Sequence, residues 1–221
     1  MSFFVTGTDT NAGKTYATAL LIRALRKQGI DCVGMKPICC GVRDDAETLH
    51  LASAGAAPLN DVNPVWLRTP AAPYVAAMVE NRPIDLDLIR AGFASLQAAH
   101  SSVVVEGVGG WMVPIAQDYF VSDLVKDLKL PVLVVVANRL GALNHAVLTV
   151  RAIRAEGLEC LGVILNEAVP APEEESVAVT TNRAVLEAVL DARVLLEIPH
   201  GATDLELDAE LLWLLTGTQA A

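Results

Sequence analysis

Short apolar runs alternate along the chain with segments whose apolar residues recur at helical spacing. The apolar runs predict strands at residues 3–6, 32–35, 102–105, 131–137, 161–165 and 194–198. A first helix is expected from about Ala17 to its stop at Gly29, followed by helices at about 45–54, 85–99, 142–155, 175–190 and 204–215. Several strands are apolar on both faces. The pattern therefore predicts an α/β fold with a mostly parallel central sheet and helices on both faces.

The segment 56–83 interrupts this alternation and is rich in proline, with Pro58, Pro64, Pro70, Pro73 and Pro83. Neither side of it has the pattern of an independently complete domain. We therefore interpret it as an irregular excursion near a site and not as a linker between domains.

Composition is consistent with one well-buried domain over residues 1–221, because 53% of the residues are hydrophobic and only 19% are charged. A formal charge of −10 disfavours binding to nucleic acid or to anionic lipid. The N-terminal residues lack the features of a signal peptide, and the longest apolar runs are too short to span a bilayer. We therefore expect a cytoplasmic protein that binds neither nucleic acid nor membranes.

The strongest chemical signal joins the first predicted strand to the first helix, where residues 7–15 read Gly-Thr-Asp-Thr-Asn-Ala-Gly-Lys-Thr. Such a turn before a helix N-terminus surrounds an anion with backbone N–H groups. Gly13 permits close approach to a phosphate, Lys14 reaches its oxygens, and Thr15 supplies a hydroxyl for Mg²⁺. The spacing is one residue longer than in the common phosphate loop unless Thr8 replaces the first glycine. The alternative is a plain strand-to-helix turn with an exposed lysine.

Three more charged residues stand where predicted strands end or helices begin. Glu106 ends an apolar strand and precedes a glycine-rich turn, an arrangement that places a metal-binding carboxylate beside a phosphate loop. Lys36 follows the second strand, at the edge where parallel strands gather ligands, although a solvated lysine is the plainer interpretation. Asp45 opens the next helix, where a carboxylate commonly interacts only with the helix dipole. Together they predict phosphate and metal chemistry at one edge of the sheet.

In their order along the chain, these motifs resemble dethiobiotin synthetase over nearly the whole sequence. The loop at 7–15 is the most diagnostic string, and it is followed by Lys36-Pro37, Asp45-Ala46, Glu106-Gly107-Val108-Gly109-Gly110-Trp111 and Leu140-Gly141-Ala142-Leu143-Asn144-His145. The resemblance implies a P-loop NTPase fold, ATP as co-substrate and Mg²⁺ as cofactor. It also implies a homodimer in which the partner subunit completes the substrate site.

The activity that the resemblance implies is closure of a cyclic urea. One amine of 7,8-diaminopelargonic acid takes up carbon dioxide, supplied directly or from bicarbonate, to give a carbamate, which ATP then phosphorylates. The second amine attacks the carbamic–phosphoric anhydride, so that dethiobiotin, ADP and phosphate are released. Phosphoryl transfer of this kind needs positioning and charge neutralisation more than a protein nucleophile.

The resemblance also implies a role for each matching residue. Lys14 and Lys36 would be catalytic and offset charge on phosphate and carbamate, while Mg²⁺ would be held by Thr15, Asp45 and Glu106. The nucleotide would be bound by Asp9, Thr10, Asn11, Ala12, Gly13, Lys14, Thr15, Tyr16, Asn166 and Pro199. The diamine and carbamate would be bound by Thr10, Lys36, Cys40, Gly107, Gly109, Gly110, Leu143 and Asn144. From residue type alone, Asn166 could equally be a turn residue and Asn144 a helix cap.

Two positions depart from the family's pattern. A glutamate is common where this chain has Asn11, and a serine is common where it has Cys40. Neither departure removes a main metal or phosphate group. We therefore expect an altered affinity or rate and not a loss of activity.

Three other classes of protein share parts of this pattern. A partitioning ATPase with a deviant phosphate loop would carry a lysine five residues before Lys14, where this chain has Asp9. A cobyrinic-acid-type amidoligase needs a glutamine-hydrolysing domain, for which the chain is too short. A paralogue that binds nucleotide without turnover is favoured only by Asn11 and Cys40. Dependence of ADP release on both diamine and bicarbonate would separate it from an enzyme.

Overall fold

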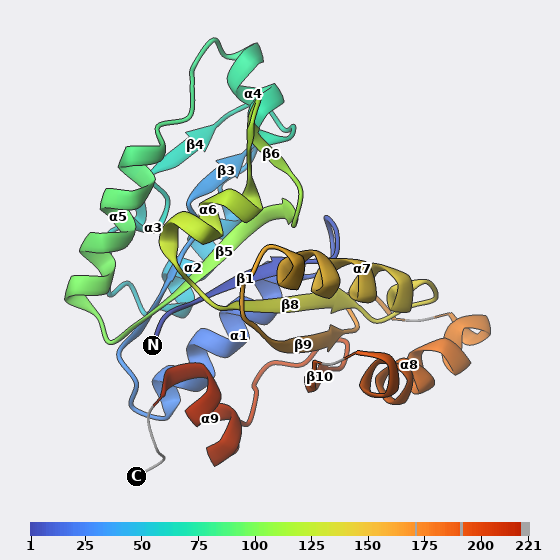
Figure 1. Ribbon diagram of the computed structural model, residues 1–221. Coiled ribbons are helices and arrows are strands. Elements are labelled where there is room, and N and C mark those ends of the chain that lie inside the picture. The colour runs from blue at the N-terminus through green and yellow to red at the C-terminus, as the bar shows by residue number, and fades with distance from the viewer. Residues whose placement is uncertain (171, 191, 218–221) are drawn as a thin grey trace.

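The computed structural model describes residues 1–170, 172–190 and 192–217 and has an α/β fold (Figure 1). Within these ranges the central sheet has six strands, all parallel, in the order β10-β9-β8-β1-β5-β2. Their bounds are Phe3–Gly7 for β1, Cys32–Met35 for β2, Ser102–Gly110 for β5, Val132–Ala137 for β8, Cys160–Asn166 for β9 and Val194–Ile198 for β10. All six predicted strands and the predicted fold class are confirmed, but β5 runs to Gly110 and not to 105, so Glu106 and the glycines expected to form a turn after it lie within the strand.

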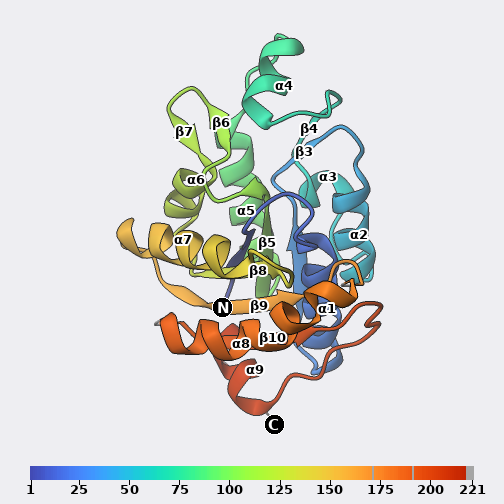
Figure 2. The same cartoon turned by 90° about the vertical axis from the view of Figure 1, so that its right-hand side faces the viewer.

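Helices cover both faces of this sheet. Figure 2 shows α6 (Val121–Leu128) and α7 (Ala142–Ala155) on one face, and α1 (Lys14–Lys27) and α2 (Asp44–Ala52) on the other. The remaining longer helices are α5 (Leu86–Ala99), α8 (Ser176–Val189) and α9 (Ala209–Thr216). The sequence analysis did not predict α6, although its apolar residues at 121, 124, 125 and 128 have helical spacing.

Helix α1 shows how local sequence sets up the edge of the sheet where ligands bind. Leu20, Leu21 and Leu25 are fully buried in the core, and each such side chain stabilises a fold by about 1.5–3 kcal/mol. The helix begins directly after Gly13 and is followed by Gly29, both with a left-handed φ of 79°. Packing and these two glycines therefore fix where the helix N-terminus meets the end of β1.

The segment 56–83, interpreted as an irregular excursion near a site, is partly regular. The segment contains α3 (Leu59–Val62), β4 (Val65–Leu67) and α4 (Pro73–Val79), and β4 pairs in parallel with β3 (Ile38–Cys40). Each element has three to seven residues, too few for a periodic pattern to appear in the sequence. Figure 1 shows β3, β4 and α4 beyond the end of the central sheet.

The last helix also begins later than predicted, at Ala209 and not near 204. The Asp208 carboxylate accepts a hydrogen bond from the Leu211 N–H at 2.8 Å and caps the helix. Residues 202–208 are not helical, and Asp204 instead forms an ion pair with Lys27 at 2.5 Å. A short hairpin of β6 (Pro114–Ala116) and β7 (Tyr119–Phe120) and a 3₁₀ turn at Glu173–Glu175 complete the elements. No helix in the described part of the chain is long and apolar enough to cross a membrane.

Candidate active site

The loop between β1 and α1 turns sharply before the helix N-terminus. Asn11 and Gly13 have left-handed backbone conformations, with φ of 62° and 79°. Asparagine adopts this conformation more readily than most residues, which is a local reason for its presence at position 11. At Gly13 a Cβ atom would lie 2.0 Å from Asn166 Nδ2, so a side chain has no room there. The Asn166 amide donates to the Ala12 carbonyl at 2.9 Å and ties this loop to the end of β9.

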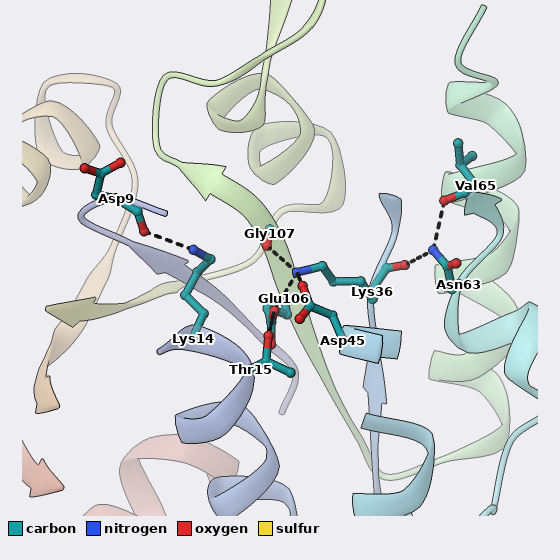
Figure 3. A network of polar contacts seen from close by, with 9 residues as sticks. All are labelled: Asp9, Lys14, Thr15, Lys36, Asp45, Asn63, Val65, Glu106 and Gly107. Atoms are coloured by element: carbon teal, nitrogen blue, oxygen red, sulfur yellow. Dashed lines mark hydrogen bonds and ion pairs between the residues drawn. The ribbon is translucent and has the colours of Figure 1, made fainter. Parts of the chain in front are cut away.

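Lys14 is the first residue of α1, and its side chain points back into this loop (Figure 3). Its ammonium donates to the Asp9 carbonyl at 3.2 Å, and only 7% of the residue is exposed. Burial, together with the positive charge of Lys36, lowers the pKa of Lys14 to about 8. An anion bound in the loop would restore the charge of this lysine, as expected of a phosphate ligand.

Lys36 lies at the centre of a buried charge cluster formed by three neighbouring elements (Figure 3). Its ammonium contacts Glu106 Oε1 at 2.5 Å and Asp45 Oδ2 at 2.7 Å, and it donates to the Gly107 carbonyl at 3.1 Å. The Thr15 hydroxyl donates to the same Glu106 oxygen at 2.7 Å. Lys36 and Glu106 are buried, whereas the Asp45 side chain is 49% exposed. The interpretation of Lys36 as a solvated lysine is therefore wrong.

The cluster fixes the charge state of its members. Burial disfavours the ammonium of Lys36, but Glu106 and Asp45 outweigh this effect and raise its pKa above the ordinary value. Partial burial opposes ionisation of Asp45, yet the charge of Lys36 lowers the pKa of this carboxyl below its ordinary value. At neutral pH the site therefore holds a charged lysine beside an ionised aspartate.

The chemistry of this donor set fits a small divalent cation. Thr15, Asp45 and Glu106 bring a hydroxyl and two carboxylates together around one cationic centre, the Lys36 ammonium. Glu106 Oε2 is buried and has no hydrogen-bond partner among the described residues. Mg²⁺ prefers oxygen ligands and is commonly held by one or two carboxylates together with substrate phosphates. Within the described ranges no group of three or more His, Cys, Asp or Glu side chains could hold a metal ion.

A cavity of about 730 Å³ opens over the cluster. It is lined by Thr10, Asn11, Gly13, Lys14, Thr15, Tyr16, Lys36, Cys40, Asp45, Pro70, Ala71, Ala72, Pro73, Val108, Gly109 and Val113. The expected phosphate-binding residues Lys14 and Thr15 and the expected carbamate-binding residues Lys36 and Cys40 therefore face one space. Burial, with the nearby charge of Glu80, raises the pKa of the Cys40 thiol to about 11, so Cys40 offers a neutral, weak hydrogen-bond donor here.

Sequence relatives place this geometry in a family. The ATP-dependent dethiobiotin synthetase BioD of Akkermansia muciniphila is 47% identical over 210 residues, which cover 95% of this chain and 97% of that protein. This chain belongs to the dethiobiotin synthetase family. The protein of the same name from Aromatoleum aromaticum is 40% identical and covers 95% of this chain and 96% of its own length. A family model described as an AAA domain matches residues 1–204.

Solved structures share the fold of this dethiobiotin synthetase family member at low sequence identity. A chain of the MinC:MinD cell division protein complex of Aquifex aeolicus superposes with a TM-score of 0.57 at 16% identity, covering 99% of this chain and 86% of that one. The signal recognition particle receptor FtsY of Elizabethkingia anophelis gives a TM-score of 0.56 at 14% identity, covering 96% and 63%. At such identities the likeness shows the fold alone.

A smaller cavity, of about 250 Å³, shares Gly13 and Tyr16 with the first. Its lining is largely apolar and consists of Gly13, Tyr16, Asn166, Glu167, Ala168, His200 and Gly201. Asn166 Oδ1 is buried and has no hydrogen-bond partner among the described residues. Pro199 does not line this cavity in the described part of the chain, but its carbonyl accepts from the Ala202 N–H at 3.2 Å. The Tyr16 hydroxyl donates to the Ala202 carbonyl, which ties this turn to α1.

The structure does not bring every expected substrate residue of this family to the Lys36 cavity. Leu143 and Asn144, in the first turn of α7, are half-buried and exposed and lie outside its described lining. Gly107 contributes its carbonyl to Lys36, and a Cβ atom there would lie 2.8 Å from the Phe4 ring. Gly110 pairs with Gly7 across β1 and β5. Direct contact of Leu143, Asn144, Gly107 and Gly110 with the substrate stays a prediction.

Several residues around the cavity were missed from the sequence. Pro70 and Pro73 line it, and their proline-rich context was the only signal. Asn63 donates to the carbonyl of the cavity residue Lys36 and accepts from Arg43, and no motif encodes these hydrogen bonds. Because these contacts join short elements far apart in the chain, only the folded structure shows them.

Proposed function

We propose that this chain is an ATP-dependent ligase that closes the ureido ring of dethiobiotin from 7,8-diaminopelargonic acid and carbon dioxide. The observation that carries the proposal is that the phosphate-loop residues Lys14 and Thr15 and the buried Lys36 cluster face one cavity of about 730 Å³. The names of relatives that are up to 47% identical over 95% of the chain support the same reaction.

In this proposal, the chain's own residues act mainly by holding charge in place. Lys14 contacts the transferred phosphate, and Lys36, fixed between Glu106 and Asp45, faces the carbamate oxygens. Backbone groups around Gly109 line the same space. Preorganised positive charge stabilises the negative charge that develops in the reaction without a cost in reorganisation.

The reaction balances without a protein nucleophile. One amine adds to carbon dioxide and releases a proton, and a carbamate oxygen attacks the γ-phosphorus of ATP as ADP leaves. The second amine then attacks the carbamate carbon, and phosphate leaves with the oxygen that joined it to that carbon. Thr15, Asp45 and Glu106 would hold Mg²⁺, which supplies neutralisation of phosphate charge when it is bound with ATP.

The proposal includes a homodimer. Leu143 and Asn144 lie outside the described lining of this chain's own Lys36 cavity, which supports a role in the site of a second subunit. The Leu140 N–H donates to a Glu175 carboxylate oxygen at 3.0 Å, so the start of this segment is held by the turn before α8. A cytoplasmic location stays a prediction from the sequence.

Phosphate release from ATP, with each component omitted in turn, tests the proposed function. We expect release to require Mg²⁺, the diamine and bicarbonate together, with dethiobiotin detected by mass. Phosphate release that ignores the diamine would instead identify a simple ATPase. Nucleotide binding without any diamine-dependent product would identify a paralogue that binds but does not turn over.

A further inference from the structure

A short stretch of the proline-rich segment runs along the part of the chain that carries Lys36. We call residues 59–67 the splint. The Lys36 N–H donates to the Val62 carbonyl at 2.7 Å, and the Val65 N–H donates to the Pro37 carbonyl at 3.2 Å. Strands β3 and β4 then pair, and the Gly41 N–H donates to the Leu67 carbonyl at 2.9 Å. The splint therefore follows residues 36–41 over their whole length.

Asn63 is the centre of the splint, and every polar atom of its side chain has a partner. Its Nδ2 donates to the Lys36 carbonyl at 2.7 Å and to the Val65 carbonyl at 2.9 Å, as Figure 3 shows. Its Oδ1 accepts from Arg43 Nε at 2.8 Å, and the residue is 1% exposed. The backbone φ of −134° suits almost any residue, so the turn itself does not require asparagine. The requirement comes from these three hydrogen bonds.

Arg43 connects the splint to the second acid of the cluster. Its guanidinium also donates to Asn60 Oδ1 at 3.0 Å and to the Asn63 carbonyl at 2.8 Å, and it stacks over the Trp66 ring at 5.4 Å. Arg43 directly precedes α2, which begins with Asp44 and Asp45. The Asn63 side chain thus links the backbone of Lys36 to Arg43, the residue that directly precedes the helix of Asp45.

This link matters because β2 is an edge strand. In the central sheet β2 has a partner on one side only, which is β5. Beyond its last residue, the Lys36 peptide is held by the splint on both its N–H and its carbonyl. Displacement of reacting groups by about 1 Å can reduce rates by about 10²-fold. Contacts of 2.5 and 2.7 Å from Lys36 to the two acids depend on this backbone position.

We propose that Asn63 is a positioning residue that sets the Lys36 ammonium through the Lys36 carbonyl and sets Asp45 through Arg43. The kinetic part of this inference rests on the proposed function. The placement of Lys36 does not, and it can be measured in the protein without substrates.

The test compares Asn63→Asp and Asn63→Ala with a matched control, Ser53→Ala. Asn63→Asp keeps an oxygen for Arg43 but loses both donors, whereas Asn63→Ala loses every side-chain bond. Ser53 is equally buried and braces the same strand, since its hydroxyl accepts from the Gly34 N–H at 2.9 Å. The control therefore removes one buried hydrogen bond to β2 and leaves the contacts of Lys36 unchanged.

Two readouts are taken on each folded variant. The first is the rate at which acetic anhydride acetylates Lys36, measured by peptide mass spectrometry relative to the exposed Lys129. The second is steady-state kinetics, from which kcat and each KM are determined separately. We expect both Asn63 variants to label several-fold faster at Lys36 and to lose about tenfold or more in kcat, with a KM for ATP close to that of the control. Ser53→Ala should match the unaltered protein in both.

Equal Lys36 labelling in Asn63→Asp and Ser53→Ala would overturn the proposal, and so would a change in only one of the two readouts. If the unaltered chain makes no dethiobiotin, the proposed function fails, and the labelling result still decides the placement of Lys36. If neither Asn63 variant folds, Arg43→Lys takes their place. Lysine at this position keeps the positive charge but lacks the planar guanidinium that donates to Asn63. Faster Lys36 labelling than in the control would support the link from Asn63 through Arg43, and unchanged labelling would refute it.

Discussion

Lys14 and Lys36 are two buried lysines in one site whose charges respond in opposite ways to their surroundings. Lys36 has two carboxylates within 2.7 Å, and they raise its pKa. Among the described residues the Lys14 ammonium donates only to the Asp9 carbonyl, and burial with the Lys36 charge lowers its pKa to about 8. Lys36 is thus a fixed charge, whereas the charge of Lys14 depends on what binds beside it.

Lys14→Ala is expected to reduce turnover by about 10²–10³-fold while the fold is kept, because a phosphate loses its main cation. The lowered pKa of Lys14 means that folding disfavours its charged ammonium. Removing this group should therefore not lower the thermal midpoint of unfolding. Lys27→Ala, near the other end of α1 at an exposed ion pair, is the control and should be nearly neutral in both measurements. Near-normal turnover in Lys14→Ala would refute the phosphate-loop mechanism.

Nucleotide binding should become linked to proton uptake as the pH rises through about 8. In the free protein Lys14 loses its proton above this pH, because its pKa is lowered, and bound phosphate raises the pKa again. Calorimetric titration with ADP in buffers of different ionisation enthalpy should show little uptake by Lys14 near about pH 6.5 and most of a proton near about pH 9. The same pH-dependent uptake in Lys14→Ala would show that another group is responsible.

At the scale of elements, the phosphate loop works because three separate features coincide at Gly13. Its left-handed φ starts α1, its missing side chain leaves room for Asn166, and the Asn166 amide holds the neighbouring carbonyl of Ala12. The loop at the end of β1 and the end of β9 thus form one unit. A change in the loop or at the end of β9 should therefore alter the affinity for the nucleotide.

Gly13→Ala and Gly29→Ala separate these features. Both positions have a φ of 79°, so each alanine should cost about 1–2 kcal/mol of unfolding free energy, as measured by urea denaturation. At Gly29 nothing lies within 4 Å of an added Cβ, whereas at Gly13 it meets Asn166 Nδ2 at 2.0 Å. We expect Gly13→Ala alone to weaken ADP binding by at least about tenfold. Equal ADP affinity in the two variants would contradict the coupling of Gly13 to Asn166.

The longer elements and the chemistry at the ends of strands are predictable from this sequence. The strands at β1, β5 and β8 are apolar runs, and Lys36 and Glu106 stand where such runs end. The splint is not predictable, because α3 and β4 have only four and three residues and act through contacts across more than twenty positions. The burial of Lys36 likewise depends on two acids from other elements, which no local pattern reveals.

At the scale of the whole molecule, one edge of the sheet gathers the ends of β1, β2, β5 and β9 into a single site. Leu143 and Asn144, in the first turn of α7, lie outside the described lining of the cavity over Lys36. The proposed dimer with shared sites would account for this separation. The arrangement leads to a test in which two inactive proteins restore activity together.

Lys14→Ala and Asn144→Ala are expected to be weak enzymes separately, because one lacks the phosphate cation and the other a residue given to the partner. After subunit exchange, random pairing makes about half of the dimers mixed, and each mixed dimer has one intact site. The mixture should therefore recover about a quarter of the unaltered activity. Activity equal to the mean of the two separate variants would show that Asn144 serves its own subunit or none.

The most direct measurement of the central claim is product formation from ¹³C-labelled bicarbonate, MgATP and 7,8-diaminopelargonic acid. We predict dethiobiotin with one labelled carbon, formed in step with ADP by the unaltered chain and not by Lys14→Ala. ADP formed without labelled dethiobiotin, or labelled product formed equally well by Lys14→Ala, would contradict the account.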